Sequence, residues 1–95
     1  MTQAQGIFEK DPDATLDYSV DWTPWLGSDT IDSVEWIVPD GLVKEAEPAP
    51  SVAGGKATVW ISGGALNQSY AVICRVATTG GRHDDRTIIF DIRKR

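Results

Sequence analysis

SYAVICRVAT, residues 69–78, is the clearest β-strand in the sequence and decides the fold. Apolar side chains occupy every second position of this segment, at Tyr70, Val72, Cys74 and Val76. Arg75 falls between them and therefore points to the opposite face. A period of two is typical of a strand with one face on a hydrophobic core and the other in solvent.

Further strands follow from alternation or from flanking turn residues, and they cover residues 15–22, 30–38, 42–45, 56–61 and 86–92. No segment shows a helical period over a useful length. The pattern predicts an all-β chain, a small immunoglobulin-like antiparallel β-sandwich of six to seven strands. Tyr70 follows a glycine-rich connection, so we expect a tyrosine corner, with its hydroxyl bonded to backbone a few residues upstream.

The first residues differ from the rest of the chain. Residues 1–13 are polar, contain Pro12 and lack periodicity. We therefore expect a flexible N-terminal arm over residues 1–13 and the immunoglobulin-like β-sandwich domain over residues 14–95.

The composition describes one domain of 95 residues with a net charge of −5. Residues 1–50 hold eleven acidic and two basic residues, whereas residues 51–95 hold three acidic and seven basic residues. Either these charges pair across interleaved strands, or an acidic edge of one copy meets a basic edge of the next. Net acidity argues against nucleic-acid binding. No signal peptide and no apolar run long enough to span a bilayer is visible.

The sequence offers no convincing reaction centre. His83 is the only histidine, and Asp84 and Asp85 follow it directly, which does not usually give the geometry of a catalytic triad. The more ordinary interpretation is a polar turn in which Arg82 and Arg86 neutralise the two acids. The aspartates near residue 13 lack the loop pattern of a calcium site. We expect no catalytic residue, no metal and no cofactor.

Four tryptophans are many for a chain of this length. Trp22 and Trp36 share faces with apolar residues and are expected in the core, whereas Trp60 faces away from its apolar neighbours. Trp25 follows a proline, and with Leu26 it is either an exposed interface anchor or a lid over one end of the sandwich. The candidate protein-interface residues are Trp25, Leu26, Trp60, Arg82, His83, Arg93, Lys94 and Arg95.

Several stretches also recur together in one known family. They are LDYSVDW at 16–22, WLG at 25–27, WIVPDGL at 36–42, ATVWISGG at 57–64 and TTGGR at 78–82. In order and spacing the chain resembles, from about Lys10 to the C-terminus, the small bacteriophage proteins described as phage fiber-tail adaptors. The proline-rich acidic segment 44–55 departs from the pattern, so a binding surface built from that loop is not carried over.

The resemblance implies a non-enzymatic structural protein of the virion tail, assembled in the host bacterial cytoplasm. Its partners would be other virion proteins, namely the tail tube, the connector or nozzle and the tail fibre, and several copies would form a ring. No nucleic acid, membrane or cofactor is implied. Two alternatives stay open: a head-tail completion or decoration protein of the virion, or a surface- or glycan-binding immunoglobulin-like module that uses Trp25 and His83.

Overall fold

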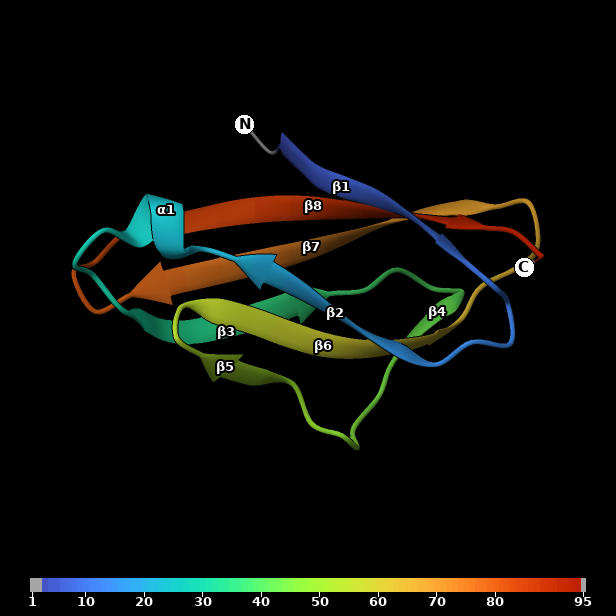
Figure 1. Cartoon of the computed structure of the whole chain (residues 1–95), viewed down its shortest axis with the longest axis horizontal. Helices are drawn as coiled ribbons and strands as arrows, with labels where there is room; N and C mark the ends of the chain where they lie inside the picture. The colour runs from blue at the N-terminus through green and yellow to red at the C-terminus, as the bar shows by residue number, and fades with distance from the viewer. Residues whose placement is uncertain (1–2, 95) are drawn as a thin grey trace.

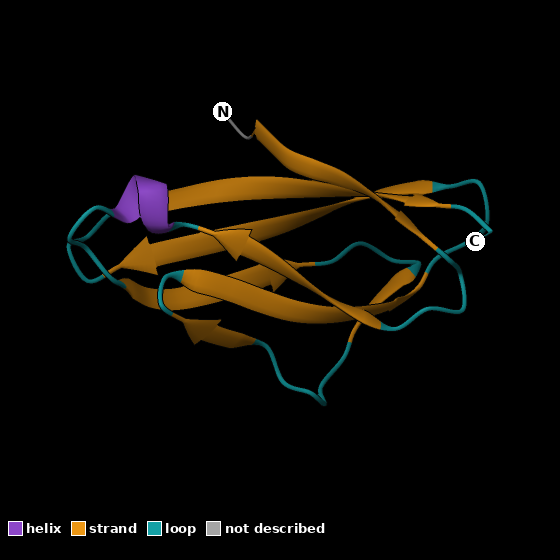
Figure 2. Cartoon of the chain, viewed as in Figure 1, coloured by secondary structure: helices purple, strands orange, loops and turns teal. Residues whose placement is uncertain are grey.

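The computed structural model describes residues 3–94, which form two facing β-sheets (Figure 1). Sheet A has the strand order β1-β8-β7-β3, and sheet B contains β2, β6 and β4, with β5 also paired to β6. Strands dominate the structure (Figure 2), which confirms the prediction of an all-β sandwich. The element bounds are β1 Gln3–Lys10, β2 Leu16–Asp21, α1 Thr23–Leu26, β3 Ile31–Ile37, β4 Leu42–Lys44, β5 Ser51–Ala53, β6 Lys56–Gly63, β7 Ser69–Thr78 and β8 His83–Ile92.

The core lies between the two sheets, where the alternating patterns placed it. Val72, Cys74 and Val76 of β7 are fully buried, and Trp22 and Trp36 are also core residues. Burying an aliphatic side chain of this size stabilises the fold by about 1.5–3 kcal/mol. In the part of the chain that the model describes, no helix is long and apolar enough to cross a membrane.

The predicted bond of the tyrosine corner is present at the start of β7. The backbone N–H of Ala65 donates to the hydroxyl oxygen of Tyr70 at 3.1 Å. The ring of Tyr70 also lies against Gly41, where a Cβ atom would come within 2.6 Å of a ring carbon, and Gly41 has a φ of 104°. Only glycine tolerates both conditions. The further immunoglobulin-like details stay a prediction.

The N-terminal segment differs from the expected flexible arm. Gln3–Lys10 forms β1, which pairs in parallel with β8, so sheet A is not purely antiparallel. Its residues do not alternate between apolar and polar because other contacts hold β1 in place. These are backbone pairing with β8, the contacts of the Phe8 ring with Tyr18 and Phe90, and the hydrogen bonds of Lys10. The Lys10 side chain is 1% exposed, and its ammonium donates to the carbonyl oxygens of Asp11 at 2.9 Å and Gly63 at 2.6 Å.

Two short elements were also not expected from the sequence. The segment predicted as a loop up to Gly55 contains β5, which forms a tight hairpin with β6 through Gly54 and Gly55. Together with β1, β5 brings the described strands to eight. β2 ends at Asp21, and the chain then makes the single turn of α1, in which Pro24 lies in the first turn, where proline is well suited.

Candidate protein-interaction site

Arg82 ties α1 to the connection between β7 and β8 at one end of the sandwich. Its guanidinium group donates to the carbonyl oxygens of Trp25 at 3.1 Å and Leu26 at 2.9 Å, and to the carboxylate of Asp29 at 3.1 Å. The same group lies 4.2 Å from the centre of the Trp25 ring. A cation at a helix C-terminus, bonded to the last carbonyl groups, stabilises that end.

Asp29 is the acceptor at the centre of this cluster. Hydroxyl groups of the two threonines at the end of β7, Thr78 and Thr79, and the backbone N–H groups of Thr30 and Gly80 surround its carboxylate. These hydrogen bonds, together with Arg82, hold the pKa of Asp29 well below its usual range. The network therefore fixes the loop between α1 and β3 against the hairpin.

Trp25 and Leu26 close this end of the sandwich. Leu26 is 7% exposed and belongs to the core, which leaves little of its side chain for a partner. Trp25 is half-buried, and its ring lies 5.2 Å from the ring of Trp22. Trp25 and Leu26 thus cover this end of the core, which is the lid arrangement of the two alternatives, and part of Trp25 still faces solvent.

The polar turn around His83 is arranged differently from the prediction. His83 is exposed but begins β8, where it pairs with Ala77. Arg86 lies 3.6 Å from Asp84, as predicted, whereas the partner of Asp85 is Arg75 at 2.9 Å and not Arg82. Hydrogen bonding and charge from Arg75 lower the pKa of Asp85.

Arg82 therefore does not neutralise the adjacent acids, since its partner is Asp29, far away in the sequence. Among residues 3–94, no cluster of histidine, cysteine and acidic side chains could hold a metal ion. Cys74 is buried, and burial raises the pKa of its thiol to about 11. A buried neutral thiol is a packing residue rather than a nucleophile.

The remaining candidates lie in two other places. Trp60 is half-buried on β6 in sheet B, where it pairs with Asp17 of β2. Arg93 and Lys94 lie beyond the end of β8, at the opposite end of the domain from α1 (Figure 1). The backbone N–H of Arg93 donates to Lys10 at 2.9 Å. Arg95 lies outside the described residues.

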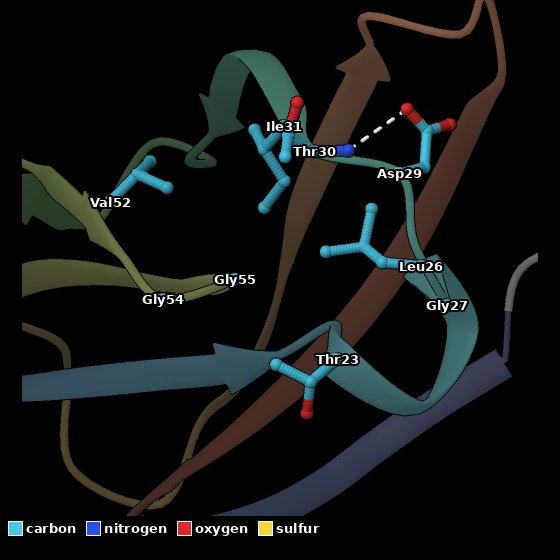
Figure 3. A pocket seen from close by; sticks show the side chains of 9 residues that line it. All are labelled: Thr23, Leu26, Gly27, Asp29, Thr30, Ile31, Val52, Gly54 and Gly55. Carbon is cyan, nitrogen blue, oxygen red and sulfur yellow. Dashed lines mark hydrogen bonds between the residues drawn. The ribbon is translucent and has the colours of Figure 1, made fainter.

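A hollow that the sequence did not predict opens beside α1. It has a volume of about 360 Å³ and is lined by α1, the following loop, the start of β3 and the β5–β6 hairpin. Figure 3 shows Leu26, Ile31 and Val52 reaching it from three different elements. A second hollow of about 200 Å³ continues along β3 and β5 and shares Ile31 and Val52 with the first. Little in the sequence indicates this hollow, because Val52, which is exposed in the structure, lies in a segment that was predicted to be a loop.

Residues 10–91 match a family model described as the podophage GP4 fiber-tail adaptor protein gp77. No curated protein sequence matches the chain. The matched range covers nearly all the described strands, from the end of β1 to the end of β8.

Proposed function

The chain belongs to the podophage GP4 fiber-tail adaptor family, and we propose that it connects the phage tail to the tail fibres by rigid docking of its two ends. The family places the protein in the virion tail as a structural adaptor, with virion proteins such as the tail fibre as partners. The family match from residue 10 to residue 91 is the observation that carries this proposal.

The shape of the domain supports docking at opposite ends. The sandwich is 41 Å along its longest axis and 20 Å along its shortest. The end at α1 carries the hollow beside Leu26, together with Trp25, Arg82 and exposed His83. The other end carries Arg93 and Lys94, which are exposed. We propose that the α1 end contacts the fibre and that the basic end contacts the tail or connector.

Rigidity supports the same role. An adaptor that holds a fibre has to transmit force without bending, and the Arg82 cluster fixes α1 and two loops to the hairpin of sheet A. Binding surfaces on a rigid scaffold lose little conformational entropy on docking. We further propose that several copies form a ring, with the open edge of β1 and its exposed Ile7 and Phe8 at the contact between copies.

The test uses phage particles that lack this protein. Particles produced without the gene, and then with the gene supplied from a plasmid, are purified and their proteins quantified by mass spectrometry. We expect particles without the protein to keep their tails and to lose their fibres, and the plasmid to restore the fibres. Fibres that stay attached without the protein would contradict the adaptor role. Loss of the whole tail would indicate a completion protein instead.

A further inference from the structure

The two hollows form one groove between the sheets, which we name the β3–β5 groove. It contains the residues that line either hollow, and Ile31 and Val52 belong to both. Leu26, Val34 and Trp36 supply buried or half-buried apolar surface along it. Val52 stands at the junction of the two hollows with 46% of its surface exposed. Its exposure leaves apolar surface open to a partner.

One side of the groove is the open edge of a sheet. β3 is the last strand of sheet A and pairs only with β7 in the described sheet. The backbone N–H and C=O groups on its other side therefore form an edge to which another strand can add. β5, on the other side of the groove, is only three residues long and exposed throughout. A strand placed beside β3 would send alternate side chains into the hollows.

The negative charge of the groove favours an added strand that carries basic side chains. The described residues that line the two hollows include two carboxylates, Asp29 and Asp32, and no lysine or arginine. Arg82 already pairs with Asp29, but Asp32 is exposed at the edge strand. Glu35 lies farther along the same strand, but Arg75 of β7 already pairs with it at 3.8 Å, so Asp32 is the carboxylate that faces an added strand. A basic side chain on the added strand would therefore be attracted to this edge.

We infer that the β3–β5 groove binds an extended segment of the tail fibre, which adds as a strand to β3. Aliphatic side chains at alternate positions of that segment fill the hollows, and a lysine or arginine lies opposite Asp32. The inference rests on the proposed adaptor function. We assign the segment to the fibre because the groove opens beside α1, at the end of the domain that the proposed function gives to the fibre.

The first test blocks the groove without touching the core. Val52→Arg places a long charged side chain where the hollows meet. Val43→Arg, at a valine of β4 that is exposed to a similar degree but lies outside the groove, is the matched control. Each variant is supplied to phage lacking the gene, and the adaptor and fibre proteins per particle are quantified. We expect Val52→Arg particles to contain the normal amount of adaptor but at least about tenfold less fibre, because a like charge and a steric block are added.

The outcomes separate the inference from the adaptor function itself. Normal fibre content with Val52→Arg overturns the groove assignment while leaving the adaptor role intact. Absence of the Val52→Arg protein from particles assigns the groove to the tail instead of the fibre and also overturns the inference. Fibres that persist when the protein is missing altogether contradict the adaptor role. Matching thermal unfolding of the two purified variants shows that both fold.

The second test locates the contact directly. Hydrogen exchange is measured by mass spectrometry on the purified chain, alone and mixed with the purified full-length fibre protein. We expect the amides of residues 31–37 to gain protection in the mixture, and Asp32→Lys to weaken the complex by at least about tenfold. Protection confined to other strands, or equal binding by the Asp32→Lys variant, would overturn strand addition at β3.

Discussion

Replacing Trp25 by alanine tests whether this residue mainly covers the end of the core or mainly contacts a partner protein. Truncating a fully buried tryptophan costs about 3–5 kcal/mol of stability, and Trp25 is only half-buried. Its ring nevertheless contacts the Trp22 ring and the Arg82 guanidinium group, contacts that contribute about 0.5–1.5 and 0.5–1 kcal/mol respectively. We therefore expect Trp25→Ala to lower the free energy of unfolding by about 2–3 kcal/mol.

The assay is urea unfolding of the purified protein, followed by far-ultraviolet circular dichroism at 25 °C. In a domain of this size such a loss also lowers the melting temperature by roughly 10–20 °C. Trp60→Ala is the matched control, because Trp60 is also half-buried but lies on β6, away from α1. Its expected loss is smaller, about 1 kcal/mol.

The lid interpretation fails if Trp25→Ala changes the free energy of unfolding by less than about 1 kcal/mol and fibres are nevertheless lost from particles. Trp25 would then act chiefly as a surface anchor. A large loss of stability together with normal fibre attachment at low temperature would show that its role is structural.

Three further changes test other parts of the account. The depressed pKa of Asp29 means that its contribution to stability is present above about pH 4 and is lost as the pH falls below that. Asp29→Asn should therefore be less stable than the parent protein at pH 7, and its stability should fall less steeply as the pH is lowered. Parallel stability–pH curves for the two proteins would contradict this. Gly41→Ala should lower the free energy of unfolding in urea by more than about 2 kcal/mol, because Gly41 has a positive φ and a Cβ there would collide with the Tyr70 ring. Gly54→Ala should lower it by only about 1 kcal/mol, because a Cβ at Gly54 meets nothing within 4 Å. Equal losses for the two variants would refute the steric argument. Cys74, with its pKa raised to about 11, should resist a thiol reagent at pH 8 until urea unfolds the protein, and rapid labelling of the folded chain would show that the core opens.

The sequence predicted those parts of the fold in which one face is apolar and the other polar. β7 is the clearest case, since its buried valines and Cys74 lie at every second residue. β1 escaped prediction because backbone pairing with β8 holds it and because a charged side chain, Lys10, is the buried one among residues 6–10. A buried lysine that bonds to carbonyl oxygens looks like a solvated residue in a one-dimensional pattern.

The candidate site was predictable only in part for a related reason. Arg82 stands near Asp84 and Asp85 in the sequence, but its partners are Asp29 and the last carbonyl groups of α1. Such contacts depend on how the two ends of distant strands meet. The β3–β5 groove likewise combines α1, β3 and β5, and none of the three shows a motif by itself.

The position of the chain in the intact particle tests the central claim most directly. A cryo-electron microscopy map of the virion should show the sandwich between the tail and each fibre, with the α1 end and the β3–β5 groove toward the fibre and Arg93 and Lys94 toward the tail. Density for the chain on the capsid, or at the junction of head and tail with no fibre beside it, would contradict the account.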